Sequence, residues 1–261
     1  MLERLAYKEQ ITAEHENAIA KKMDLHQYYK DIFESSSITM NESLKRDNEL
    51  AKIHSFVDDL LTWYDVLKPR GEAVILKYAA SELQLSALSV VSGLYRQSFT
   101  SLRLALELSL SAIFFSTNEL DFREWEKGQR DIYWHQLVDT DDTDQGVFSR
   151  RWARGFFPEL EDSVKVYNKL AKDTYRNLSE FVHGNAFTWE VNKSNIVFNE
   201  QLFNQWLNNF SNLSKIISFA LSLRFLKKLE SSSINRLEAH LLEFVGHIAE
   251  IRKIIGGAME E

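Results

Sequence analysis

An arginine and a histidine stand seven positions apart in the segment YRNLSEFVHGN, in which Arg176 is followed by His183 and then at once by Gly184. If this segment is helical, seven residues make almost two turns, so the two side chains lie within about 20° of each other in azimuth and about 10 Å apart along the axis. Histidine transfers protons near neutral pH, and arginine holds phosphate oxygens through paired N–H groups. The pair therefore has the functional groups that metal-free cleavage of RNA requires.

That reaction needs one group to remove the proton of the 2′-hydroxyl, another to protonate the leaving 5′-oxygen, and a cation near the phosphate. A single helix supplies one histidine and one arginine. Two copies of the helix, related by a two-fold axis, supply two of each around one phosphate. The chemistry therefore predicts a homodimer with RNA as its substrate.

A purely structural explanation of the same residues stays open. Arg176 can pair with Glu180 one turn further along the helix, and His183 can bind carbonyl groups at a helix end closed by Gly184. In that case both side chains only hold the fold together. The spacing is compatible with both roles.

The composition favours an all-α fold. The chain of 261 residues is 44% hydrophobic and has only nine Gly and two Pro, so few residues interrupt long helices. Two densely apolar helices, hinged near Ser92-Gly93, are predicted between residues 73 and 116. Another is predicted to have Pro158 in its first turn, to run to His183 and to end at Gly184. Further helices are predicted over residues 44–64, 121–137, 147–155, 200–228 and 234–255.

Two regions differ from this helical pattern. Residues 1 to 32 carry a thin apolar stripe among many charges, which predicts a long exposed helix or an arm on a partner subunit, and the stretch ESSSITMNES predicts a break after it. The stretch TWEVNKSNIVF alternates around a polar turn and predicts one small β-hairpin at about 188 to 198. We expect a long amino-terminal helical extension over residues 1–70 and a helical-bundle domain over residues 71–261.

The pattern of Arg176, six intervening residues and His183 near the carboxyl end of a predicted helix resembles the R-x(4–6)-H signature of the HEPN superfamily, and Asn177 matches the polar residue that commonly follows the arginine there. The segment LRLALELSLSAIFF, followed much later by YRNLSEFVHGN, is similar to a set of uncharacterised bacterial HEPN-like proteins associated with phage defence. The resemblance covers about residues 73 to 228. It implies a helical bundle and, in active members, a dimeric metal-independent endoribonuclease that is often a toxin or an antiviral abortive-infection effector.

The hypothesis of a HEPN-like nuclease assigns roles to four residues of the segment. His183 is the expected general acid or base, and Arg176 is expected to contact the scissile phosphate. Asn177 and Glu180 are the expected orienting neighbours of this catalytic pair.

Arg103 and Glu107 lie four positions apart inside an apolar helix, where charged side chains are costly unless they are paired. The simplest expectation is an ion pair within the helix. The alternative is that Glu107 faces Arg176 or His183 and orients it, so that the two residues support the catalytic pair.

A basic segment, SRRWARGFF, is the best sequence indication of a path for RNA in a chain whose net charge is −7. It places Arg150, Arg151 and Arg154 next to Trp152, and such residues bind single-stranded RNA by contacting phosphates and stacking on bases. The same residues are equally typical of an ordinary amphipathic helix end.

No cofactor and no metal site is expected. The chain has no cysteine, which excludes disulfides, thiolate zinc sites and iron–sulfur clusters. The acidic loop DTDDTDQG does not fit an EF-hand, since Asp144 stands where glycine belongs and Arg150 where the closing glutamate belongs, so we expect a solvated loop that caps the next helix. The spacing of His135, His240 and His247 indicates no metal site, and the sequence contains no Gly-rich phosphate loop.

The first residues, MLERLAYKEQ, do not form a signal peptide, and the longest apolar run covers about 12 residues, well short of the roughly 20 that a membrane span needs. We therefore expect a soluble cytoplasmic protein with no membrane partner.

The leading hypothesis from the sequence is a HEPN-type endoribonuclease that needs no metal ion. An alternative from another class is a non-catalytic helical interaction or regulatory subunit of a bacterial defence complex, in which the amino-terminal helices dock onto a partner protein. Nucleotide binding in a pocket of the bundle is a third possibility, which follows only from the breadth of the superfamily.

Overall fold

The computed structural model describes residues 24–186, 188 and 196–256. Every regular element in these residues is a helix, so the prediction of an all-α fold is confirmed. The predicted β-hairpin at 188–198 falls mainly on residues 189–195, outside the described part of the chain.

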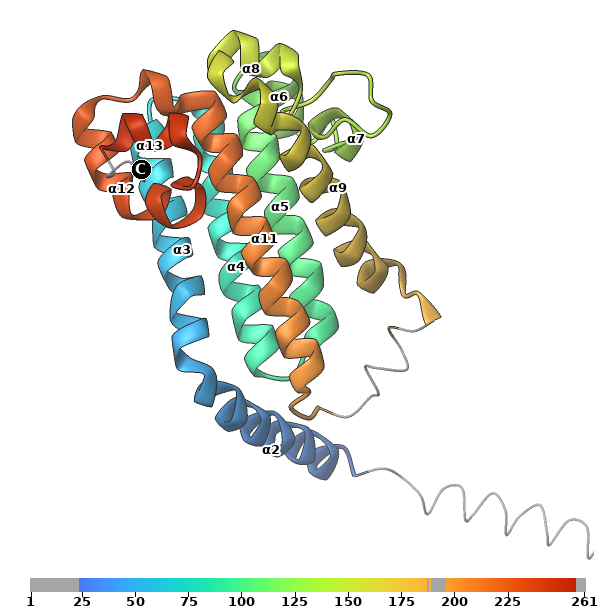
Figure 1. Cartoon of the computed structure of the whole chain (residues 1–261). Helices are drawn as coiled ribbons and strands as arrows, with labels where there is room; N and C mark the ends of the chain where they lie inside the picture. The colour runs from blue at the N-terminus through green and yellow to red at the C-terminus, as the bar shows by residue number, and fades with distance from the viewer. Residues whose placement is uncertain (1–23, 187, 189–195, 257–261) are drawn as a thin grey trace, which may run out of the picture.

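In the described residues five long helices form the bundle, and each runs in the opposite direction to the one before it (Figure 1). They are α3 (Asp47–Leu67), α4 (Val74–Val91), α5 (Tyr95–Phe115), α9 (Glu161–His183) and α11 (Glu200–Phe225). Helix α5 packs against α4, α9 and α11, and this position explains why its sequence is apolar on almost every side.

Shorter helices cover the end of the bundle where α5 finishes (Figure 1). These are α6 (Glu119–Glu126), α7 (Trp134–Leu137) and α8 (Arg150–Phe156), with α12 (Ser231–Val245) and α13 (Ala249–Ile255) beside α3 and α11. Single 3-10 turns join or extend several helices at 44–46, 71–73, 158–160 and 226–228. The single helix predicted over 234–255 is observed as two helices, α12 and α13. The chain leaves the first of them at Gly246, where a Cβ atom would come within 2.4 Å of the Leu242 carbonyl oxygen.

The hinge predicted at Ser92-Gly93 is confirmed between α4 and α5. Gly93 adopts the left-handed conformation with φ +80°, and a Cβ atom there would lie only 3.0 Å from Ile196 and 3.1 Å from Thr39. Only glycine combines that backbone conformation with so close an approach. Gly184 ends α9 in the same conformation, as predicted, with φ +66° and its N–H bonded to the Glu180 carbonyl.

The break predicted at ESSSITMNES is wrong, since α2 (Leu25–Ser43) continues through that stretch. The small hydroxyl residues pack on the α4–α5 hinge instead of ending the helix. Ser36 donates a hydrogen bond to the Ser92 carbonyl (3.2 Å), and Thr39 and Ser43 are buried. This support from the bundle outweighs their weak helix propensity.

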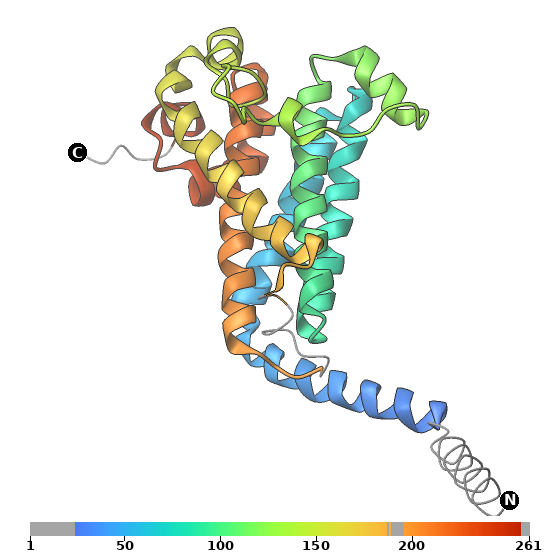
Figure 2. The ribbon, with the colours of Figure 1, turned by 90° about the vertical axis from the view of Figure 1, so that its right-hand side faces the viewer.

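Helix α3 belongs to the predicted amino-terminal extension 1–70, and its apolar face lies in the same core as α4. Phe56, Leu60 and Trp63 are completely buried. By contrast, the first half of α2 projects away from the bundle (Figure 2).

Two bundle segments, Gly71–Val91 and Tyr95–Phe115, are long and apolar enough to cross a membrane. Core helices of globular proteins have the same length and composition, and 67% of the second segment is buried within the bundle. The cytoplasmic location therefore stays a prediction.

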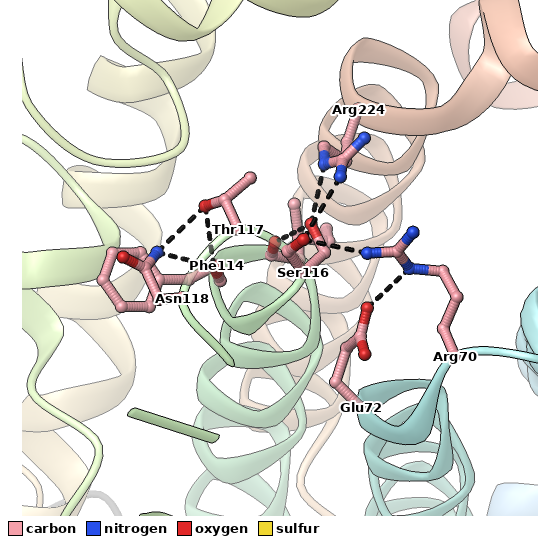
Figure 3. Close-up of polar contacts among 8 residues, drawn as sticks. Arg70, Glu72, Phe114, Ser116, Thr117, Asn118 and Arg224 are labelled. Carbon is pink, nitrogen blue, oxygen red and sulfur yellow. Dashed lines mark hydrogen bonds and ion pairs between the residues drawn. The ribbon is translucent and has the colours of Figure 1, made fainter. Parts of the chain in front are cut away.

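Two arginines hold the carboxyl end of α5 (Figure 3). Arg70 and Arg224 both donate to the Ser116 carbonyl, at 2.8 and 3.2 Å, and Arg70 also pairs with Glu72 at 2.6 Å. Burial, and then the nearby charge of Arg70, lower the pKa of Arg224 to about 10, so it is still a cation at neutral pH. Cations at this position neutralise the negative end of the helix dipole.

A buried hydrogen-bond chain joins three helices of the bundle. Trp206 on α11 donates its indole N–H to the Ser86 hydroxyl on α4 (2.8 Å), which in turn donates to the Ser98 carbonyl on α5 (2.8 Å). All three residues are fully buried, so neither partner of Ser86 has water as a replacement.

We predict that Ser86→Ala lowers the free energy of unfolding by about 1 to 3 kcal/mol, because it leaves the indole N–H and a carbonyl without their buried partner. Ser81→Ala is the matched control, since Ser81 is exposed on the same helix and its hydroxyl, within the described residues, bonds only to the carbonyl of Lys77. Its expected effect is below about 0.5 kcal/mol. Urea denaturation measures both, and equal losses in the two variants would contradict the assigned role of the buried chain.

Candidate functional site

Arg176 and His183 lie on one continuous helix, α9, and both are exposed. Their separation of seven residues places them on one strip of the helix, about 10 Å apart along its axis. His183 is the last residue of α9, directly before Gly184. The helix therefore presents the pair to solvent rather than to the core.

The opposite side of α9 fixes this strip in place. Phe181 is buried and stacks on Phe99 of α5, with ring centres 3.9 Å apart and planes at 12°. Arg96 of α5 donates to the Phe181 carbonyl and, at 3.0 Å, to the Thr188 hydroxyl. Because residues 181 and 183 are about 200° apart on a helix, this anchoring directs His183 outward.

The pairing of Arg176 with Glu180 is not formed. Within the described residues, neither Arg176 nor His183 makes a side-chain hydrogen bond or ion pair. Glu180 is half-buried, and its carbonyl accepts the N–H groups of Gly184 and Asn185 that close the helix, while Asn177 is exposed. The two candidate catalytic side chains are therefore not held by the fold.

Arg103 and Glu107 form the expected ion pair within α5, at 3.3 Å. Glu107 also accepts a hydrogen bond from the Tyr175 hydroxyl (3.0 Å), and Arg103 both bonds to that hydroxyl and lies over the tyrosine ring, 4.6 Å from its centre. Tyr175 directly precedes Arg176 in α9. The Glu107 carboxylate thus reaches Tyr175, the neighbour of the candidate pair, and no bond joins it to Arg176 or His183 in the described part of the chain.

Trp134 completes this cluster, and the sequence pattern did not single it out. Its ring stacks on Tyr175 with centres 3.8 Å apart and planes at 6°. Burial, and then the Glu107 carboxylate, raise the pKa of Tyr175, so its hydroxyl stays protonated and can donate to Glu107. The cluster joins α5, α7 and α9 at Tyr175, the residue next to Arg176.

The basic segment forms α8, but its four candidate residues do not act as one surface. Arg154 forms a bidentate ion pair with Glu161, in which its Nε and Nη2 atoms donate to the two carboxylate oxygens at 2.9 and 2.5 Å. Arg150 and Arg151 are exposed, and Trp152 is half-buried against Phe156, with the two ring centres 5.3 Å apart.

The basic helix α8 and the candidate pair of Arg176 and His183 are far apart in one chain. Helix α8 leads through Pro158–Leu160 into the first residue of α9, whereas His183 is the last residue of that helix. Twenty-two residue steps along a helix span about 33 Å. Two exposed lysines, Lys165 and Lys169, lie between them on the same strip as Arg176, at spacings of eleven and seven residues.

A pocket of about 700 Å³ lies beside α8. Arg151, Trp152 and Phe156 of α8 line it together with His135 of α7. Its other lining residues are Gly155 of α8, Gln136 of α7, Phe114, Thr117 and Asn118 at and just beyond the end of α5, and Asp144, Gln145, Gly146 and Ser149 of the loop before α8.

The acidic loop caps the next helix, as predicted, because the Asp144 carboxylate accepts the N–H of Arg150 at 2.6 Å. Asp139 is not solvated but buried, and it accepts hydrogen bonds from the N–H groups of Thr143 (2.9 Å) and Asp144 (2.7 Å). Burial raises the pKa of Asp139, but these hydrogen bonds outweigh it and hold the pKa below its ordinary value. Among the described residues, no three His, Asp or Glu side chains gather as a metal site.

His240 lies between a carboxylate and a serine, an arrangement that also occurs in hydrolases. Its Nδ1 lies 3.0 Å from Asp59, and its Nε2 lies 3.2 Å from the Ser218 hydroxyl. Ser218 is fully buried in α11 and donates to the Ser214 carbonyl at 2.7 Å. Since no substrate can reach this hydroxyl, the set serves to join α3, α11 and α12.

Comparison of the chain with protein-family models, with curated proteins and with solved structures found no match. The assignment of the site therefore rests on its own geometry and chemistry.

We predict that Glu107→Gln lowers the free energy of unfolding by about 1.5 to 3 kcal/mol, because it leaves the half-buried Arg103 cation without its counter-charge. Glu119→Gln is a matched control, since Glu119 pairs with Arg123 at the same four-residue spacing but is 81% exposed. We expect Glu119→Gln to lower the free energy of unfolding by less than about 0.5 kcal/mol. Thermal and urea unfolding measure both; a loss in the control as large as in Glu107→Gln would refute this role of the cluster.

Proposed function

We propose that the chain is a metal-independent endoribonuclease of HEPN type that acts as a homodimer, and that it serves as a toxin or an antiviral abortive-infection effector. The observation that carries the proposal is the exposed strip of α9, on which Arg176 and His183 lie together without partners among the described residues. A histidine and an arginine with a purely structural role would be expected to bond within the fold. The biological role follows from the family resemblance.

In this proposal His183 transfers a proton to or from the reacting oxygens, and Arg176 binds the scissile phosphate through its guanidinium. Asn177, exposed beside Arg176, and Glu180, on the same side of the helix, orient the substrate and the pair. The 2′-hydroxyl attacks the phosphorus, the 5′-oxygen leaves with a proton, and a 2′,3′-cyclic phosphate remains. No step needs a metal ion.

The strip also suggests how RNA approaches the pair. Lys165 and Lys169 extend it from Arg176 toward Arg151 of α8, and all of these cations are exposed. Phosphate groups bind such a series of cations with little dependence on sequence. The tight ion pair of Arg154 with Glu161 makes that arginine the weakest member of the RNA-binding set.

We predict that the purified protein cleaves single-stranded RNA in excess EDTA and leaves 2′,3′-cyclic phosphate ends. Arg176→Ala and His183→Ala are each expected to lower the rate at least 100-fold, within the range that one proton-transfer group or one charge-stabilising group contributes. Lys52→Ala, which removes an exposed cation of α3, is the control and should retain the wild-type rate. Undiminished cleavage by both folded α9 variants would refute the assignment.

Mixing the two inactive variants tests the dimer. When Arg176→Ala and His183→Ala protomers pair, a site built from two chains regains one arginine and one histidine. Activity should therefore return, but well below the wild-type rate, because one histidine must serve both proton transfers. If each chain carried a complete site, the mixture would stay inactive.

The second candidate function is a non-catalytic interaction or regulatory subunit, and the first half of α2 favours it. Leu25, Tyr28, Tyr29, Ile32 and Phe33 form one apolar stripe on this projecting helix. Phe33 is 77% exposed and Tyr29 is 65% exposed. Large aromatic side chains gathered on one exposed face mark an interaction surface.

This alternative predicts that replacing Tyr29 and Phe33 together by serine leaves the melting temperature of the isolated protein nearly unchanged, since both side chains are exposed. The same change should abolish any stable complex formed through α2, which sedimentation velocity detects as a lower mass. If the doubly substituted chain keeps both its assembly and its RNA cleavage, α2 has no role in either function.

A further inference from the structure

A smaller pocket, of about 300 Å³, lies where α3, α11 and α12 pack against one another (Figure 1). Its volume is at the lower end of the range for sites that hold small organic ligands. From its lining we propose that it binds a free α-amino acid with a large apolar side chain. This site includes no residue of α9, and binding there does not depend on the proposed cleavage of RNA.

The apolar part of the wall is fixed by the core. Leu207, Phe210 and Phe244 form this part. Phe210 and Phe244 both pack edge to face on the completely buried ring of Phe56, with ring centres 5.8 and 5.2 Å from it. Because Phe56 holds both rings in place, an apolar side chain of a ligand can pack on them without first ordering the protein.

The polar part of the wall carries charges that the fold leaves unpaired. Lys52, Lys215 and Glu243 are exposed, and within the described residues none of them forms an ion pair or a side-chain hydrogen bond. Glu49, the fourth charged residue of the wall, is instead neutralised by Arg46 at 2.8 Å, and this hydrogen bond holds the pKa of Glu49 below its ordinary value. Two ammonium groups and one carboxylate are thus free to bind the carboxylate and the ammonium group of a zwitterion.

The hydroxyl of Ser211 independently indicates a ligand. The other serines of α11 each donate to the carbonyl four residues back, at 2.7 to 2.9 Å: Ser214, Ser218 and Ser222. Ser211 is half-buried and lines the pocket, and its hydroxyl has no hydrogen-bond partner in the described part of the chain. Polar groups withdrawn from water are normally hydrogen-bonded. Since Ser211 and Lys215 are four residues apart on one face of α11, both can donate to the same carboxylate of a ligand.

Isothermal titration of the full chain tests the proposal, with L-phenylalanine and L-leucine as the probes. Three fragments each lack one part: 3-phenylpropanoate lacks the ammonium group, 2-phenylethylamine lacks the carboxylate, and glycine lacks the side chain. We expect one site for the two amino acids and binding of every fragment that is weaker by roughly tenfold or more, because each loses a charged hydrogen bond or the apolar contact. No binding of either amino acid at millimolar concentration, or undiminished binding of any fragment, would overturn it.

Substitution of Glu243 tests where the ammonium group binds. Glu243→Gln should weaken L-phenylalanine by roughly tenfold or more and leave 3-phenylpropanoate unchanged, because only the amino acid has a group that the carboxylate contacts. Glu238→Gln is the control, since Glu238 lies on the same helix but does not line the pocket, and its affinity should match the parent. Equal weakening of L-phenylalanine and 3-phenylpropanoate by Glu243→Gln would contradict this contact.

The lysines and Ser211 test the carboxylate contact and the space. Replacing Lys52 and Lys215 together by glutamine should abolish binding of L-phenylalanine, whereas Lys253→Gln, on an exposed lysine of α13 outside the pocket, should have no effect. Ser211→Leu should also abolish binding and retain the melting temperature of the free protein, because the added side chain occupies the pocket. Parental affinity in both the double lysine variant and Ser211→Leu would refute the site.

N-acetyl-L-phenylalanine distinguishes a free amino acid from the carboxyl end of a peptide. It keeps the carboxylate and the aromatic side chain but has an amide in place of the ammonium group. We expect it not to displace L-phenylalanine. If it binds as tightly, the pocket holds the end of a peptide chain and the assignment to a free amino acid is wrong.

Discussion

Burial of α5 on nearly every side is the constraint on which the rest of the structure depends. Eight of its nine residues from Ala105 to Ile113 are buried, and α4, α9 and α11 pack around it. A helix with so much apolar surface is stable in water only at the centre of a bundle. Its two ends then become the places where polar groups gather: the Arg96 contacts with the end of α9, and the Arg70 and Arg224 contacts with Ser116.

The proposed catalytic pair depends on this packing through the inner face of α9. Phe181 stacks on α5 and Tyr175 bonds to Glu107, so the helix has only one orientation on the bundle. Arg176 and His183 are consequently turned outward and left without partners in the described residues. The core thus positions the pair without touching it, and a second chain can approach the exposed strip.

The other polar features divide between the two ends of α9. The α8 pocket lies near its first residue and His183 at its last, about 33 Å away. In one chain these cannot contact the same nucleotide. Only a long strand of the proposed RNA substrate could contact both. The projecting α2 offers a further surface at the opposite end of the bundle from α8 (Figures 1 and 2).

The sequence by itself determined the elements whose signals are local. The apolar spacing, the Ser92-Gly93 hinge and the Gly184 cap predict α4, α5 and α9 correctly, because glycine and hydrophobic periodicity act within a few residues. It also placed Arg176 and His183 on one strip. Only the tertiary structure decided which contacts between distant segments form: the continuation of α2 over the hinge, the binding of Glu107 to Tyr175, the burial of Asp139 and the pocket shared by α5, α7 and α8. These contacts form between side chains of helices that are distant in the sequence, so the spacing of residues along the chain does not predict them.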